Sequence, residues 1–173
     1  VLCVSAAPVI SAQEVWTTIT YDDFESGMGN FAIATGARDA ERVQSSFAHQ
    51  GSFCFRIRDN SGEDSSVFHD TWHTVSDYID LRVTFWYYAN SMENGEDFFL
   101  EYQAQPTGNW QVVQQYVAGT DFANDQHILS SVVLSAIGVF DTSGEAKIRF
   151  RCDASHNNDS CLLYTSDAAD ELL

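Results

Sequence analysis

The stretch DLRVTFWYYA, Asp80–Ala89, decides the fold of this sequence. Large apolar residues alternate with a second, mixed series, as expected when an extended chain turns one face toward a core. The apolar series is Leu81, Val83, Phe85 and Tyr87, and the mixed series is Arg82, Thr84, Trp86 and Tyr88. β-branched and aromatic residues also fit the pleated surface of a sheet. The stretch therefore predicts a strand with one buried face.

Shorter segments of the same kind lie on both sides of it, separated by turn-forming stretches such as Pro106–Asn109. No segment keeps a helical period, and no internal repeat is evident. The other predicted strands are Asn30–Ile33, Arg42–Ser46, Ser52–Arg58, Ser65–His69, Asp97–Gln103, Trp110–Val117, His127–Leu134 and Ala146–Cys152. Their number and spacing predict an all-β fold, a two-sheet antiparallel β-sandwich with jelly-roll topology.

Before these strands lies Tyr21–Gly27, YDDFESG, which predicts a short edge strand that buries Phe24. A strand that opens a sandwich requires a partner, and we expect this partner to come from the far end of the chain. Asp23 and Glu25 alternate with Phe24, so both carboxylates lie on the same side of the strand.

The balance of charges limits the possible partners. The 173 residues include 8 Lys+Arg and 25 Asp+Glu, which gives a net charge of −17. Nucleic acid is excluded because no basic stripe is present to neutralise phosphates, and anionic membrane surfaces are disfavoured for the same reason. The hydrophobic content of 45% is sufficient for the core of one domain. We expect a secreted protein, without membrane insertion, that meets cations or neutral ligands such as sugars.

The first twelve residues, Val1–Ala12, are apolar, uncharged and rich in small side chains. They are typical of the rear half of a truncated secretory signal peptide that is cleaved after Ala12, and an ordinary buried strand is the alternative. Residues 13–160 then form the β-sandwich module, which we expect to be one module of a longer extracellular chain.

The segment Cys161–Glu171, CLLYTSDAADE, resembles the translation of a transposase sequencing adapter over eleven consecutive residues. This resemblance implies that residues 161–173 form a tail that is not native. It also implies that the last strand of the module is missing after about Ser160. The alternative is a native C-terminal strand with an acidic tail.

Outside these two end segments, the chain contains the cysteines Cys54 and Cys152. An even number of cysteines in a secreted protein makes one disulfide conceivable. The strand pattern, however, places Cys54 opposite the core face and Cys152 on it. We therefore expect free thiols.

Several motifs occur in an order that resembles extracellular jelly-roll modules of the MAM and carbohydrate-binding types. The motifs are Asp23–Gly27, Gly51–Phe53, Arg56–Asp59, Val83–Tyr88, Gly95–Tyr102, Trp110 and Ile148–Ser155. The resemblance covers Tyr21–Ser160, and the four-cysteine pattern of animal MAM domains is absent. It implies a sandwich that binds carbohydrate and holds a structural calcium ion.

The same resemblance implies that Glu25 is a calcium ligand. Asp23, on the same side of the predicted strand, and Asp159, near the end of the module, are the further candidates. Calcium prefers several oxygen ligands, among them carboxylates and backbone carbonyls. The alternative is an acidic, solvated edge that discourages aggregation between strands.

A ligand surface is predicted where aromatic and cationic side chains share a strand face. Aromatic rings stack on sugar rings, and guanidinium groups bind hydroxyls or carboxylates. The candidate residues are Trp86, Tyr88, Arg56, Arg58 and Trp110. The alternative is that these side chains pack beneath loops.

These features favour a secreted, non-catalytic module that binds carbohydrate or glycosylated surfaces and holds a structural calcium ion. An adhesive or structural module that contacts proteins is the first alternative. A glycosidase or lyase with a sandwich fold is the second, and for it the sequence offers neither an acid/base pair nor a nucleophile constellation.

Overall fold

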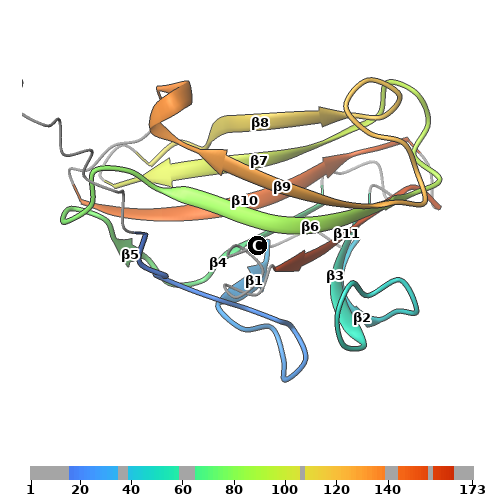
Figure 1. The fold of residues 1–173 in the computed structure, drawn as a ribbon, viewed down its shortest axis with the longest axis horizontal. Coiled ribbons are helices and arrows are strands. Elements are labelled where there is room, and N and C mark those ends of the chain that lie inside the picture. Colours follow the sequence, from blue (N-terminus) through green and yellow to red (C-terminus); the bar gives the residue numbers. More distant parts are fainter. Residues whose placement is uncertain are drawn as a thin grey trace, which may run out of the picture.

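The computed structural model describes residues 16–34, 39–58, 65–105, 108–138, 144–155 and 158–165 of the chain. Two antiparallel sheets form a sandwich (Figure 1). The β7 sheet has the order β1 (Phe31–Ile33), β4 (Ser65–His69), β10 (Glu145–Asp153), β7 (Asp97–Ala104) and β8 (Gln111–Val117), and β5 (His73–Thr74) pairs with β10. The β6 sheet has the order β2 (Ala40–Gln44), β3 (Phe53–Arg58), β11 (Ser160–Thr165), β6 (Arg82–Asn90) and β9 (His127–Val133). A single 3-10 turn, η1 (Ser135–Ile137), follows β9 among the described residues.

The predicted fold class is confirmed. The chain crosses repeatedly between the two sheets, for example from β3 to β4, from β6 to β7 and from β9 to β10, as it does in a jelly roll. Each of the nine predicted strands from Asn30–Ile33 to Ala146–Cys152 is present, with ends that differ by at most two residues.

The core lies between the sheets and consists of the apolar series that the alternation predicted. In β6 these residues are Val83, Phe85 and Tyr87, all of them buried. Tyr87 packs edge-on against Phe98 of β7, with ring centroids 4.9 Å apart. Burial of each such side chain contributes about 1.5–3 kcal/mol. This packing fixes which side chains of every strand point outward.

The prediction of an opening strand at Tyr21–Gly27 is wrong, because this stretch forms a loop with bends. Phe24 is buried as predicted, but its φ of 62° lies in the left-handed region and interrupts any extended chain. Arg42 donates from Nε to the Phe24 carbonyl (2.5 Å) and from Nη2 to the Glu25 carbonyl (2.8 Å). The Arg42 side chain therefore binds the two backbone carbonyls that a neighbouring strand would otherwise have bound.

The strand at the far end of the chain, β11, does not pair with Tyr21–Gly27. β11 lies between β3 and β6, and its register joins Leu162 to both Arg56 and Tyr88. The non-native origin of residues 161–173 stays a prediction. The signal-like segment Val1–Ala12 lies outside the described residues. Among the residues that are described, no helix has the length and apolarity needed to cross a membrane.

The expectation of free thiols is confirmed for Cys54 and Cys152, both of which are buried. Cys54 belongs to a small cluster on the outer side of the β6 sheet, whereas Cys152 belongs to the core between the sheets. Burial raises the pKa of the Cys54 thiol to about 11. The thiol is therefore protonated at neutral pH and has little reactivity.

The Gly29→Ala substitution should lower the free energy of unfolding by about 1–3 kcal/mol, as measured by urea denaturation. Gly29 has a φ of +59°, and an added Cβ would lie 1.7 Å from Oδ1 of Asp22, the atom that accepts the Asn30 backbone amide. Gly95→Ala is the matched control, because its φ is +98° and nothing lies within 4 Å of the added atom. Equal losses in the two variants would contradict the role of the Asp22 contact.

Candidate binding face

The outer side of the β7 sheet gathers charged and aromatic side chains. Alternation along β10 buries Ala146, Ile148, Phe150 and Cys152, and it turns Lys147, Arg149 and Arg151 outward. In the neighbouring strands, Phe68 of β4 and Glu101 of β7 are both in register with Arg149, and Phe99 of β7 is in register with Arg151. We call this surface the β7 face. It consists of Phe68, Trp72, Phe99, Glu101, Trp110, Lys147, Arg149 and Arg151.

Glu101 is the buried charge at the centre of this face, with 4% of its surface exposed. Its Oε2 accepts a bond from Nε of Arg149 (2.5 Å), and its Oε1 accepts one from Nε of Arg151 (3.3 Å). Burying a carboxylate is costly unless countercharges and hydrogen bonds compensate it. The two arginines supply both, and Glu101 in turn orients their guanidinium groups.

Each outward cation of β10 also lies over an aromatic ring. Arg149 is 4.5 Å from the ring centroid of Trp110, and Arg151 is 4.1 Å from that of Phe99. Lys147 is 4.9 Å from the ring of Trp72 and 5.6 Å from that of Phe68. These are attractive cation–π distances, and they hold flat apolar rings beside hydrogen-bond donors. All four rings are half-buried, so part of each remains accessible.

The predicted ligand residues fall on two different sheets. Trp86, Tyr88, Arg56 and Arg58 lie together on the outer side of the β6 sheet, as the strand pattern suggested. Trp110 precedes β8 and belongs to the β7 face. The structure therefore does not bring the five residues into one site.

The rings of Trp86 and Tyr88 are already stacked within the protein. His49 lies parallel to Trp86 at 3.9 Å, and Phe47 lies parallel to Tyr88 at 4.7 Å. The Tyr88 hydroxyl donates to Oδ1 of Asp125 (3.1 Å). In this arrangement, residues between β2 and β3 occupy the surface that a sugar ring would need.

Arg56 and Arg58 are tied to each other by Glu41. The Nη2 atoms of both arginines bind Oε1 of Glu41, with a distance of 3.2 Å for Arg58. The two side chains border a polar cavity of about 260 Å³. The other residues around it are Asn90, Ser91, Asn158 and Ser160. Their role in ligand binding stays a prediction.

The three predicted calcium ligands are not brought together. Oε1 of Glu25 accepts the backbone amides of Ser52 (2.8 Å) and Phe53 (2.7 Å), at the start of β3. Asp159 precedes Ser160, which pairs with Arg58 at the other end of β3. At about 3.3 Å per residue, these two ends are roughly 17 Å apart.

Asp23, the remaining candidate, accepts the backbone amide of Glu25 at Oδ1 (2.9 Å). Within the described part of the chain, no group of three or more His, Cys, Asp and Glu side chains is arranged to hold a metal ion. The residues present therefore do not fit a calcium ion shared by Glu25, Asp23 and Asp159.

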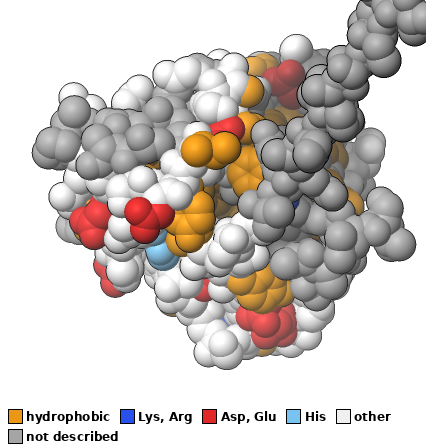
Figure 2. Space-filling model, turned by 60° about the vertical axis from the view of Figure 1, so that its left-hand side comes forward, with side chains coloured by type: hydrophobic (Ala, Val, Ile, Leu, Met, Phe, Trp, Pro, Cys, Tyr) orange, Lys and Arg blue, Asp and Glu red, His pale blue; other side chains and the backbone are white. Residues whose placement is uncertain are grey.

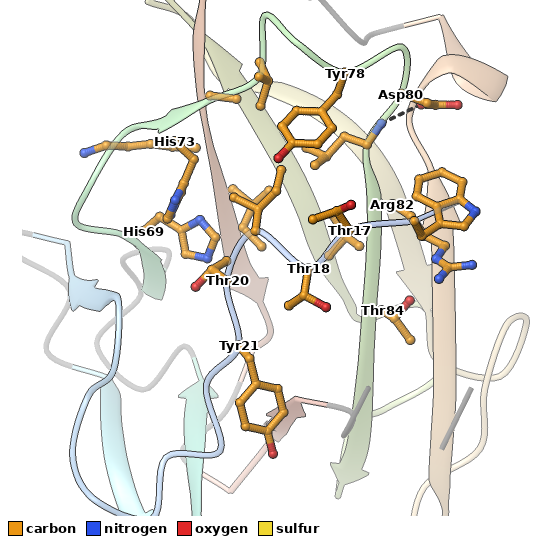
Figure 3. A pocket seen from close by; sticks show the side chains of 18 of the residues that line it. Thr17, Thr18, Thr20, Tyr21, His69, His73, Tyr78, Asp80, Arg82 and Thr84 are labelled. Carbon is orange, nitrogen blue, oxygen red and sulfur yellow. Dashed lines mark hydrogen bonds between the residues drawn. The ribbon is translucent and has the colours of Figure 1, made fainter. Parts of the chain in front are cut away.

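A cavity of about 490 Å³ opens between the sheets at the end that carries β5. Figure 2 shows this end, where hydrophobic side chains lie at the surface beside acidic ones. Among the residues that line the cavity, Trp16, Tyr21 and Ile79 are exposed. Figure 3 shows Thr17, Thr18 and Thr20 crossing the cavity on an extended segment. Its floor is formed by core residues of β6 and β10, such as Phe85 and Phe150.

His69 and His73 lie together at one side of this cavity (Figure 3), with ring centroids 4.8 Å apart. The pKa of His69 is lowered from 6.5 to about 3, chiefly by burial and also by the neighbouring His73 and Lys147. Burial also lowers the pKa of His73, against the attraction of Asp22. Both rings are therefore neutral at pH 7.

The fold is shared with solved carbohydrate-binding modules. TmCBM61, solved in complex with β-1,4-galactotriose, aligns with a TM-score of 0.56 and 18% identity over 83% of this chain and 90% of its own. CBM28, a module specific for non-crystalline cellulose, gives a TM-score of 0.58 and 14% identity over 92% and 97%. The K3 adhesin domain of Lys-gingipain from Porphyromonas gingivalis W83 gives 0.59 and 11% over 83% and 94%. No family model matches the sequence, and no curated protein matches it. At these identities, the similarity concerns the fold.

Most of the β7 face was missed by sequence reasoning. The signal was present in Lys147–Arg151, KIRFR, where every second residue is cationic. The pairing of Arg149 and Arg151 with Glu101, 48 and 50 positions earlier, depends on β7 lying beside β10, which strand patterns alone do not determine.

Proposed function

We propose that this protein is a non-catalytic carbohydrate-binding module whose ligand lies on the β7 face. The observation that carries the proposal is the row of cations on β10, each placed over an aromatic ring and two of them oriented by the buried Glu101. Rings stack on the apolar faces of sugars, and guanidinium groups donate to hydroxyls in fixed directions. The fold shared with solved carbohydrate-binding modules supports the proposal.

A binding role fits this face better than catalysis. Both oxygens of Glu101 are engaged by guanidinium groups, so this carboxylate is placed to orient side chains rather than to transfer a proton. The face also holds its donors on strands, which position side chains more rigidly than loops do. We further propose that the module acts outside the cell, as the signal-like segment Val1–Ala12 predicts.

The Trp110→Ala substitution should weaken binding by at least about 5-fold on a glycan array, because stacking contributes on the order of 1 kcal/mol per ring. Trp86→Ala is the matched control, since Trp86 lies on the opposite sheet beneath His49. The array is read with and without a chelator. Loss of binding in Trp86→Ala alone would move the site to the β6 sheet. Absence of any glycan binding by the folded protein would contradict the proposal and favour an adhesive role toward proteins.

Calcium remains part of the proposal only as a separate site near Glu25. Since the Ser52 and Phe53 amides both donate to Oε1 of Glu25, an ion at this site would bind Oε2. Calcium at saturating concentration should then raise the melting temperature, and Glu25→Gln should abolish this shift. An unchanged melting temperature in the unmodified protein at millimolar calcium would exclude the ion.

A further inference from the structure

We propose that the cavity at the β5 end of the sandwich binds a neutral aromatic molecule that carries a hydroxyl group, such as a phenol. The cavity lies between the two sheets, whereas the β7 face is the outer side of one of them, so this is a second site beyond the proposed function. The inference follows from the floor of the cavity, from two imidazoles without hydrogen-bond partners and from the balance of charge around them.

The floor of the cavity offers aromatic surface to a ligand. Phe31 of β1, Phe85 of β6 and Phe150 of β10 line it, and each is at most 6% exposed. Phe85 and Phe150 meet edge to face, with ring centroids 4.7 Å apart. A further ring would make contacts of the same kind, and apolar cavities in proteins take up aromatic molecules. The volume of about 490 Å³ lies within the roughly 300–1,000 Å³ of ordinary small-molecule sites.

His69 is a buried polar side chain at the wall of this cavity. It is 5% exposed and packs edge-on against Phe31, with ring centroids 4.5 Å apart. No hydrogen bond joins its ring nitrogens to another described residue. Within the same part of the chain, Nε2 of His73 is also buried without a partner. Figure 3 shows the two rings together at one side of the cavity.

A hydroxyl group is the partner that these imidazoles require. Burial lowers the pKa of both rings, so each ring is neutral at pH 7 and has one N–H donor and one nitrogen acceptor. Leaving such groups unpaired in a buried site costs free energy, which a bound donor or acceptor recovers. A hydroxyl can donate to the bare nitrogen or accept from the N–H, so it suits either tautomer.

The charged side chains around the cavity balance one another and are already engaged. Two carboxylates, Asp22 and Asp80, line it together with two cations, Arg82 and Lys147. Oδ1 of each carboxylate accepts a backbone amide, Nζ of Lys147 donates to a backbone carbonyl, and Arg82 lies over an indole ring. A charged ligand would lose its hydration and would find these countercharges occupied. The cavity therefore favours a neutral molecule.

The test is an NMR titration of the whole chain that follows the imidazole resonances of His69 and His73. The probes are p-cresol and three matched molecules that each differ in one feature. Toluene lacks the hydroxyl, 4-methylcyclohexanol lacks the aromatic ring, and 4-methylbenzoate carries a charge. We expect p-cresol to bind at least about 5-fold more tightly than toluene and 4-methylbenzoate, and at least about 3-fold more tightly than 4-methylcyclohexanol.

Two variants locate the binding site, and a third is the control. His69→Phe should bind p-cresol no more tightly than toluene, because the preference for a hydroxyl depends on this imidazole. Thr18 is exposed on the segment that crosses the cavity (Figure 3), and Thr18→Trp should weaken p-cresol binding at least about 5-fold by occupying the volume that the ligand needs. His127→Gln, exposed on β9 away from the cavity, should leave p-cresol binding unchanged.

Binding of toluene or 4-methylcyclohexanol as tight as that of p-cresol would overturn the inference. Binding of p-cresol that is unchanged in both His69→Phe and Thr18→Trp would do the same. Tighter binding of 4-methylbenzoate would also overturn it and would indicate an anion site. If no probe shifts the resonances of His69 and His73, water fills the cavity and the inference is wrong. Each of these results would leave the proposed glycan site on the β7 face standing, because the glycan array tests that site separately.

Discussion

The Glu101→Ala substitution should lower the free energy of unfolding by roughly 3–5 kcal/mol, the range for removing one member of a buried ion pair. The loss arises because Arg149 and Arg151 would keep their charges without the Glu101 carboxylate, with only 21% and 17% of their side chains exposed. Arg151 would retain its longer contact with Asp153, 3.8 Å from Nη1 to Oδ2. We expect the lower end of the range, since this residual exposure lets water solvate part of each guanidinium. Equilibrium urea denaturation measures the change as a shift in midpoint at constant slope.

Glu93→Ala is the control for this prediction. Glu93 is an exposed glutamate in the turn between β6 and β7, and its removal should change the free energy of unfolding by less than about 0.5 kcal/mol. A Glu101→Ala variant as stable as Glu93→Ala would mean that the two arginines are adequately solvated without their carboxylate. The orientation of the Arg149 and Arg151 side chains on the β7 face would then need another cause.

Acidification from pH 7 to pH 5 should destabilise the protein by about 2 kcal/mol through His69. Its folded-state pKa of about 3 lies below the ordinary 6.5, so the unfolded chain takes up a proton before the folded one does. The stabilisation of the folded state by neutral His69 is complete above pH 6.5, and it is lost as the pH falls from 6.5 toward 3. Each pH unit in this window is equivalent to about 1.4 kcal/mol, which makes the full effect of the order of 4–5 kcal/mol.

Measuring the midpoint of urea unfolding between pH 7 and pH 5 largely excludes the carboxylates, because most of them titrate at lower pH. His73, whose pKa burial also lowers, acts in the same direction. His69→Leu should flatten the dependence in this window. His127→Gln is the control, since His127 is exposed on β9, and it should preserve the dependence. A wild-type stability that is constant between pH 7 and pH 5 would show that His69 becomes protonated in the folded protein.

Strand positions were predictable because burial imposes a period of two on each strand. Asp80–Ala89 showed which residues of β6 face the core, and Ser65–His69 was predicted with the bounds that β4 has. The loop at Tyr21–Gly27 was not predictable in the same way. Its shape depends on the left-handed backbone of Phe24 and on Arg42, which approaches from β2.

Site residues were predictable as types but not as a constellation. The pairing of aromatic and cationic residues on one strand face suggested the right kind of surface, and Trp110 does lie on the β7 face. Trp86 and Tyr88 show the same pattern, yet Phe47 and His49 stack on them from the segment between β2 and β3. Periodicity gives the side of a strand on which a ring lies, and it contains no information about which other segment covers that ring.

Chemical-shift mapping by NMR with an oligosaccharide selected from the glycan array tests the central proposal most directly. The proposal predicts perturbed backbone amides in β7 and β10, around Phe99–Gln103 and Lys147–Arg151, and in the chain around Trp110. Amides of β3 and β6 near Cys54 and Trp86 should stay unperturbed. Perturbations confined to β3, β6 and the Phe47–His49 segment would contradict the proposal and place the ligand on the β6 sheet.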